Sequence, residues 1–249
     1  MDFRAALLDQ TRDFGELIRS ADPSTPVPTC PDWTLKQLFR HVGRGNRWAA
    51  QIIADHRAHE LDPRDVRGGK PPDDPDAAID WLNEGAQLII KAVDQVGADA
   101  RVWSFLGPRP AGWWVRRRLH EVTVHRADAA MALGVEYDLS PEMAADGISE
   151  WIELMTVQAK RSEPPVEQGR TVHLHATDGA LGPTGEWTIV NDEDGLGWSH
   201  EHGKGDVALR GPAKDLLLAI VRRRTAAEVG IEIFGDTAVW DSWLERTPF

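Results

Sequence analysis

Cysteine, tyrosine and long apolar runs are all scarce in this 249-residue sequence. Cys30 is the single cysteine, which excludes an intramolecular disulfide and favours a reducing compartment. No stretch approaches the roughly 20 apolar residues that span a membrane, and the first residues lack the apolar core of a secretory signal. We therefore expect a soluble, cytoplasmic protein without a membrane partner.

Positive charge is also in short supply. Lys and Arg number 28 against 40 Asp and Glu, which gives a net charge of −12. Nucleic-acid binding needs clustered Lys and Arg that displace counterions from phosphates, and the basic run at residues 116–118 is too short and too close to acids to supply them. We therefore expect no nucleic-acid partner. The single tyrosine contrasts with eleven tryptophans, which offer wide apolar surfaces but point to no chemistry.

The first half of the sequence has the periodicity of amphipathic helices. Apolar residues recur at three- and four-residue steps over 2–20, from about 33 to 56, from 75 to 96 and from 113 to 133. Three prolines between 23 and 28 separate the first two helices, and glycines at 97 and 134 end the last two. Asp32 or Thr34 is the expected N-cap of the second helix. We expect a four-helix bundle, an architecture whose interior builds metal sites from facing helices.

A change of periodicity marks the second half. A fifth helix begins at Ser140-Pro141, and the polar stretch at 160–165 follows it. Apolar residues then alternate over 171–177, as in a half-buried strand, and further strands are expected near 186–190, 197–200, 206–210 and 231–234, with helices after 211 and near the end. We therefore divide the chain into a helical bundle over residues 1–160 and a small α+β domain with an antiparallel sheet over residues 168–249.

Glu121 and His125 form the first candidate metal site. Four residues apart on an uninterrupted helix, they project from one face and can converge on one ion. His120 is five residues before His125, so the zinc-protease spacing of two histidines does not apply. His41, at the edge of the apolar stripe of the second helix, is the candidate third ligand. Such a set suits a divalent ion such as zinc and leaves a position open for a substrate. By spacing alone, a solvated pair and a hydrogen-bonded histidine are the commoner alternatives.

A second group of histidines lies in the expected sheet. His173 and His175 share one strand face, as do His200 and His202 if that segment is extended. Alternating histidines on the polar face of a half-exposed sheet need no metal, and the spacing fixes no carboxylate beside them. We therefore expect no ion at this position.

Two weaker candidates for functional residues are Cys30, as a nucleophile, and the arginines at 222–224, as partners of a substrate carboxylate. A helix begins just after Cys30 and favours a thiolate, but no histidine is fixed beside it in sequence, and a small buried residue is the commoner role. The three arginines follow a leucine-rich helix and suit a substrate carboxylate. Positive charge at the end of a helix is favourable in any case.

Motifs in both halves resemble the mycothiol-dependent maleylpyruvate isomerase family. They comprise residues 27–35 with Leu38 and His41, then 119–121, 125–128, 173–178, 206–212 and 234–236. The resemblance implies a DinB-like metal-binding bundle followed by the family's α+β domain. It also implies that His41, Glu121 and His125 are metal ligands, since they match the family's ligands one by one. Many members carry glycine at the position of Asp32, a departure that we expect to be structurally benign.

The resemblance implies a metal-dependent enzyme that uses mycothiol as its thiol. In such enzymes a divalent ion, usually zinc, promotes loss of the thiol proton, and the thiolate attacks a small activated electrophile. An isomerase releases the thiol after rotation about the former double bond, whereas a mycothiol S-transferase keeps the adduct as its detoxification product. Arg223 is the expected partner of a substrate carboxylate, with its two arginine neighbours as alternatives. A non-catalytic ligand-binding or regulatory protein with the same bundle is a further hypothesis.

Overall fold

The computed structural model describes residues 1–247. The chain forms two compact units, Met1–Tyr137 and Asp138–Phe249. This division lies earlier than the expected boundary between residues 160 and 168. The reason is the fifth helix, α5 (Pro141–Gln158), which packs against α6 (Ala213–Ile220) of the second unit. The helix that the sequence assigned to the bundle thus contributes to the core of the α+β unit.

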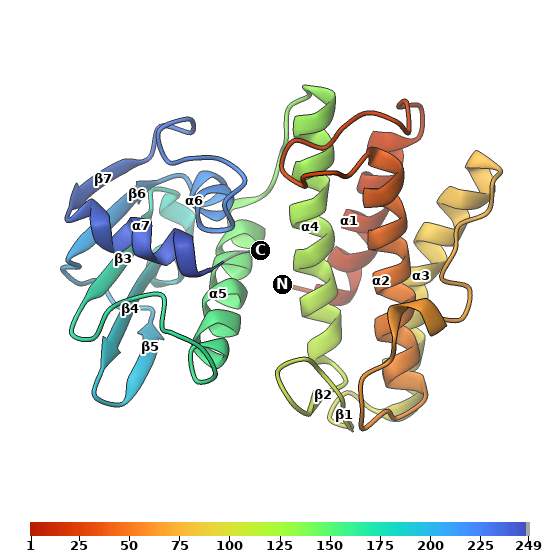
Figure 1. The fold of residues 1–249 in the computed structure, drawn as a ribbon, viewed down its shortest axis with the longest axis horizontal. Coiled ribbons are helices and arrows are strands. Elements are labelled where there is room, and N and C mark those ends of the chain that lie inside the picture. The colour runs from red at the N-terminus through yellow and green to blue at the C-terminus, as the bar shows by residue number, and fades with distance from the viewer. Residues whose placement is uncertain (248–249) are drawn as a thin grey trace. The chain divides into compact units, whose positions relative to one another are not determined.

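Long α-helices make up most of the first unit, and they are labelled α1 to α4 in Figure 1. They are α1 (Phe3–Ile18), α2 (Leu35–Ala54), α3 (Pro75–Val96) and α4 (Trp113–Leu133). Helix α4 packs against α1 and α2, and α3 packs against α1 and α2. Their apolar stripes meet in a core whose fully buried members include Phe14, Leu38, Ile52, Leu82 and Leu119, so burial of one face stabilises each helix.

The helix ends follow the expected chemistry. Gly97 and Gly134 follow α3 and α4 with φ of 90° and 65°, a region in which glycine is favoured. Thr34, rather than Asp32, is the N-cap of α2, and its backbone N–H donates to the Gln37 side chain at 2.7 Å.

Short elements lie in the connections between these helices. A 3₁₀ turn, η1 (Pro63–Asp65), lies between α2 and α3, and a two-residue ladder of β1 (Arg101–Val102) and β2 (Arg109–Pro110) precedes α4.

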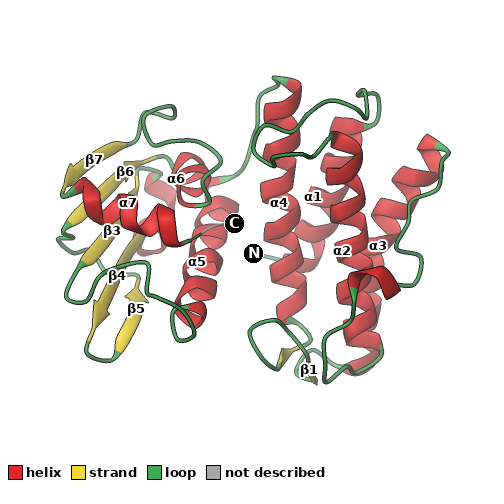
Figure 2. Cartoon of the chain, in the orientation of Figure 1, coloured by secondary structure: helices red, strands yellow, loops and turns green. Residues whose placement is uncertain are grey.

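A five-stranded sheet dominates the second unit (Figure 2). The strands are β3 (Thr171–Ala176), β4 (Glu186–Asp192), β5 (Gly195–Ser199), β6 (Val207–Gly211) and β7 (Glu232–Gly235), in the order β5-β4-β3-β6-β7. The turn η2 (Gly179–Gly185) joins β3 to β4, and α7 (Thr237–Arg246) follows β7. The sheet is mainly antiparallel, as expected. The exception is the pair β3 and β6, which is parallel because the chain returns from the β4–β5 hairpin to the other edge of β3.

The expected fold class is confirmed as a helical N-terminal unit followed by an α+β unit. Val172 and Leu174 on β3 and Leu209 on β6 lie on the buried face of the sheet, so the residues between them lie on the opposite face. Within residues 1–247, no helix is both long enough and apolar enough to cross a membrane.

Candidate metal centre

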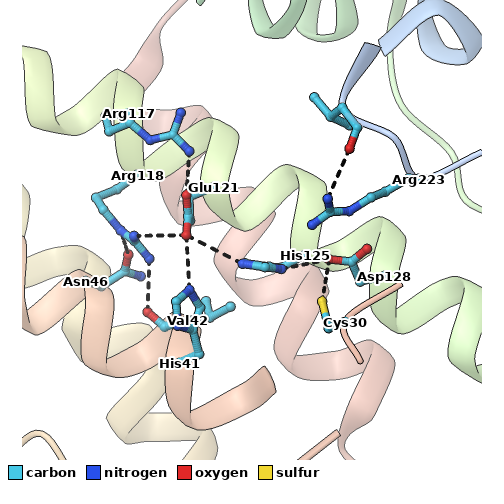
Figure 3. Close-up of polar contacts among 11 residues, drawn as sticks. Cys30, His41, Val42, Asn46, Arg117, Arg118, Glu121, His125, Asp128 and Arg223 are labelled. Carbon is cyan, nitrogen blue, oxygen red and sulfur yellow. Dashed lines mark hydrogen bonds and ion pairs between the residues drawn. The ribbon is translucent and has the colours of Figure 1, made fainter. Parts of the chain in front are cut away.

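One face of α4 carries a row of buried or half-buried polar side chains. Arg117, Glu121, His125 and Asp128 follow one another at steps of four, four and three residues, which places them along one side of the helix. Buried polar groups are costly unless they are paired. Figure 3 shows that each of these side chains reaches a partner, and that His41 approaches the row from α2.

The three predicted ligands converge. Oε1 of Glu121 lies 3.1 Å from Nε2 of His41 and 3.5 Å from Nε2 of His125 (Figure 3). Tetrahedral zinc with bonds of about 2.0–2.1 Å separates its ligand atoms by roughly 3.4 Å. One donor atom from each side chain lies within 4.8 Å of the other two. The spacing and the donor types therefore fit a divalent ion held by two imidazoles and one carboxylate.

A second carboxylate orients His125. Oδ2 of Asp128 lies 2.8 Å from Nδ1 of His125, which leaves Nε2 as the ring nitrogen that faces Glu121. Asp128 is itself held by the loop before α2, since the hydroxyl of Thr29 donates to Oδ1 at 2.6 Å and Sγ of Cys30 lies 3.5 Å from Oδ2. Carboxylates of this kind fix the orientation and tautomer of metal-binding histidines. Asp128 was not among the predicted site residues, although its three-residue step from His125 on one helix is a sequence signal that could have found it.

Two arginines flank the carboxylate of Glu121. Arg117 forms an ion pair with Oε2 of Glu121, the oxygen remote from the histidines. Nη1 of Arg118 lies 3.7 Å from Oε1, while its Nε donates to Asn46 Oδ1 at 3.0 Å. The basic run at 116–118 therefore serves in part as the buried counter-charge of Glu121.

The electrostatics favour an ionised Glu121. Burial opposes its charge, but the charge of Arg117, hydrogen bonds from both histidines and the charge of Arg118 together hold the pKa of Glu121 well below its usual range. Burial lowers the pKa of His41 despite the hydrogen bond to Glu121. Burial also opposes the imidazolium form of His125, but hydrogen bonds to Asp128, Cys30 and Glu121 outweigh it and raise its pKa to about 10.

The loop before α2 contacts this centre through Trp33. Val27 N–H donates to the Trp33 carbonyl at 2.9 Å, which folds the proline-rich segment back on itself. The Trp33 ring then lies 4.9 Å from the ring of His41 and 6.4 Å from that of His125, measured between centroids. Asp32 has a φ of +67° in this turn. We expected aspartate in place of the family's glycine to be structurally benign. At this φ, however, glycine has a conformational advantage over aspartate.

Three groups of candidate ligands occur among residues 1–247, and none of them includes His120. Besides the set on α2 and α4, Cys30 groups with His125 and Asp128. The structure thus brings a histidine to this cysteine, which sequence spacing alone did not predict. The third group lies in the sheet and consists of His173, Glu186 and His202.

Arg223 lies beyond α6, which ends at Ile220. Its side chain is buried, with Nη1 donating to the Val221 carbonyl at 3.1 Å, whereas Arg222 and Arg224 are exposed. Burial thus distinguishes Arg223 from the two other members of the run.

Comparison with known proteins agrees with the resemblance. Two uncharacterized proteins of Mycobacterium tuberculosis, MT0763 of strain CDC 1551 and Rv0738 of strain H37Rv, are 26% identical over 178 residues, which cover 62% of this chain and 88% of each relative. The crystal structure of the mycothiol-dependent maleylpyruvate isomerase is similar in fold, with a TM-score of 0.60 at 14% identity over 90% of this chain and 89% of that one. A histidine-to-alanine mutant of it gives 0.59 at 15% identity, with the same coverage.

Family models account for both halves of the chain. Residues 4–130 match the mycothiol maleylpyruvate isomerase N-terminal domain, and residues 142–242 match the C-terminal domain of the same family. The first match alone covers half of the sequence, and the second begins within the unit that starts at Asp138. The chain therefore belongs to the mycothiol maleylpyruvate isomerase family.

Proposed function

We propose that this protein is a metal-dependent, mycothiol-using enzyme of the maleylpyruvate isomerase type, in which His41, Glu121 and His125 bind a divalent ion, most suitably zinc. The observation that carries the proposal is the convergence of Nε2, Oε1 and Nε2 in a chain whose two halves both match the family. A divalent ion bound there would favour the thiolate form of a coordinating thiol near neutral pH, and three protein ligands leave a position for it.

The surrounding side chains have distinct tasks in this proposal. Asp128 accepts from Nδ1 of His125 and keeps its Nε2 turned toward Glu121. Arg117 pairs with the remote oxygen of Glu121 and keeps the carboxylate ionised. Trp33 packs beside both imidazoles and limits the access of water to them. The thiol and the single cysteine both suit a reducing compartment, so we place the enzyme in the cytoplasm.

The proposed substrate is a small carboxylate-bearing electrophile, with Arg223 as the residue that holds the carboxylate. A planar guanidinium suits bidentate carboxylate recognition, which a lysine ammonium does not reproduce. Because Arg223 is buried and Arg222 is exposed, the two positions form a matched pair. Arg223→Lys is expected to raise KM for the electrophile at least tenfold, and Arg222→Lys is expected to leave it unchanged. Equal effects of the two changes would exclude this role.

Zinc content and thiol-dependent turnover together test the metal assignment. In tag-free protein, His125→Ala is expected to lose one equivalent of zinc relative to the wild type and to abolish turnover of maleylpyruvate with mycothiol. Cys30→Ser is the control, because it alters the neighbouring group of Cys30, His125 and Asp128 without removing a proposed ligand. A His125→Ala chain with undiminished zinc would refute the site.

Product analysis separates the related functions. An isomerase returns the thiol at the end of each cycle, so the concentration of mycothiol stays constant while the electrophile changes. An S-transferase consumes one thiol for each electrophile. If neither occurs with any electrophile of this class, while a ligand still binds after metal removal, the chain is a binding or regulatory protein.

A further inference from the structure

A second cluster of metal-binding side chains lies in the C-terminal unit, on the face of the sheet opposite Val172 and Leu174. His173 and His175 project from β3 on this face. Glu186 begins β4 and lies directly across from His175 in the strand register. His202 approaches from the loop between β5 and β6.

The three histidines share one carboxylate. Oε2 of Glu186 lies 2.7 Å from Nε2 of His173, while its Oε1 lies 2.7 Å from Nδ1 of His175 and 3.2 Å from Nδ1 of His202. One donor atom from each of His173, Glu186 and His202 lies within 4.8 Å of the other two. Glu186 is thus the carboxylate that sequence spacing did not place beside these histidines.

The loop that carries His202 is held against the sheet. The hydroxyl of Thr188 donates to the Glu201 carbonyl at 2.7 Å, and Nδ1 of His200 lies 2.7 Å from the Glu186 carbonyl oxygen. A Cβ on Gly205 would lie 2.4 Å from the Val207 carbonyl oxygen and 2.9 Å from the backbone nitrogen of His173. Only glycine therefore allows this close approach, and the backbone itself positions His202 over the cluster.

The side chains of this cluster differ in their exposure to solvent. The side chain of His173 is 6% exposed and that of Glu186 is 15% exposed, whereas that of His202 is 76% exposed. Glu186 already gives Nε2 of the buried His173 a hydrogen-bond partner, and that contact does not require two more histidines to converge on the same carboxylate. With neutral imidazoles the cluster carries one negative charge. Arg210, the neighbour of His175 on β6, is paired with Glu232 at 2.8 Å, so its positive charge is compensated.

We propose that this cluster is a second metal site, in which His173, the Glu186 carboxylate and His202 bind a divalent transition-metal ion such as Zn²⁺. Imidazole and carboxylate donors suit such ions. His175 hydrogen bonds to the same carboxylate and holds it in place, as the outer partners of metal ligands do. The ion would tie the loop between β5 and β6 to strands β3 and β4, because its ligands come from all three.

Zinc titration of the full-length, tag-free chain tests this site independently of the first one. The background variant is His125→Ala, which removes a proposed ligand of the bundle site. The His125→Ala chain is expected to bind one Zn²⁺ and to unfold at a higher temperature when zinc is added. Adding His202→Ala should abolish binding, and adding His175→Ala should weaken it by about 10- to 100-fold. His202 is exposed, so its replacement leaves the core intact.

Controls distinguish a built site from adventitious histidine binding. His59 is an exposed histidine of the other unit, and His59→Ala in the same background should leave the zinc affinity unchanged. Co²⁺ in place of Zn²⁺ should give visible absorption bands that disappear with Glu186→Gln. A His125→Ala chain that binds no zinc, or that binds it equally well with and without His202, would overturn the proposal. Retention of one ion in His125→Ala but none in His202→Ala would support this site even if the bundle site fails.

Discussion

Nδ1 of His125 lies 2.8 Å from Oδ2 of Asp128, a side chain with no exposed surface. The contact determines which nitrogen of the imidazole is available to a ligand. Since Nδ1 is engaged by the carboxylate, Nε2 is the atom that faces Glu121 and His41. Asp128 is in turn held by Thr29, so the loop before α2 and the face of α4 build the centre together.

Asp128→Asn is expected to weaken zinc binding at the bundle site by about 10- to 100-fold. The amide keeps the size of the carboxylate but loses its negative charge, so His125 becomes a weaker donor and its ring is less firmly oriented. Competition with a chromogenic chelator measures the change in affinity. Asp73→Asn, an exposed change in the same unit, is the control. Unchanged affinity in the Asp128 variant would mean that the contact does not serve metal binding.

Zinc binding at the bundle site should release about one proton near neutral pH. Burial opposes the imidazolium form of His125, but its hydrogen bonds raise the pKa to about 10, so a bound ion must displace a proton from it. His41 and Glu121 contribute none, because their pKa values are lowered. Affinity should therefore rise about tenfold per pH unit below that pKa.

Calorimetry in buffers of different ionisation enthalpy measures this proton. The His202→Ala chain is the appropriate protein, since it leaves only the bundle site of the two proposed here. The apparent binding enthalpy should vary linearly with the buffer's ionisation enthalpy, with a slope near one. A slope of zero would show that His125 is already neutral in the metal-free protein.

Asp32→Gly should stabilise the fold by about 0.5–1 kcal/mol, because Asp32 has a φ of +67° and glycine has no Cβ to oppose it. Asp32→Ala is the matched control. Alanine keeps the Cβ and lacks the polar group that makes aspartate comparatively tolerant of this conformation, so it should give no gain. Urea denaturation followed by tryptophan fluorescence compares the three chains, and equal stability of the Gly and Ala variants would contradict the argument.

Sequence reasoning was most successful where one element determines the outcome. The step from Glu121 to His125 fixes their common face on any straight helix, and the glycines after α3 and α4 end them at the expected residues. It was least successful where partners come from distant segments. Glu186 gains its role from contacts with His173 and His202 that no local spacing encodes, and Asp128 is held by Thr29 from 99 residues earlier in the chain. The placement of α5 was missed for the same reason, because its partner α6 follows more than 50 residues later.

Asp206 offers a test of the α+β unit that is independent of any metal. Its Oδ1 accepts from Nη1 of Arg170 at 2.7 Å, and its Oδ2 accepts from the backbone N–H of Thr171 at 2.8 Å. The two contacts join the start of β3 to the residue that precedes β6. The hydrogen bond from Arg170 and then that from Thr171 lower the pKa of Asp206 from its usual value of 3.8, against a smaller opposing effect of burial.

The sign of the pH dependence follows from that shift. A carboxyl group whose pKa is lower in the folded state stabilises the fold above its unfolded pKa, and this contribution is lost as the pH falls through the folded value. Asp206→Asn is therefore expected to lower the free energy of unfolding by about 1 kcal/mol at pH 7, and the difference from the wild type should shrink below about pH 3.8. Urea denaturation at a series of pH values measures both, with Asp241→Asn on the exposed side of α7 as the control. A difference that stays constant down to the lowest pH would mean that the charge of Asp206 contributes nothing, and that the variant is destabilised only by altered hydrogen bonding to Thr171.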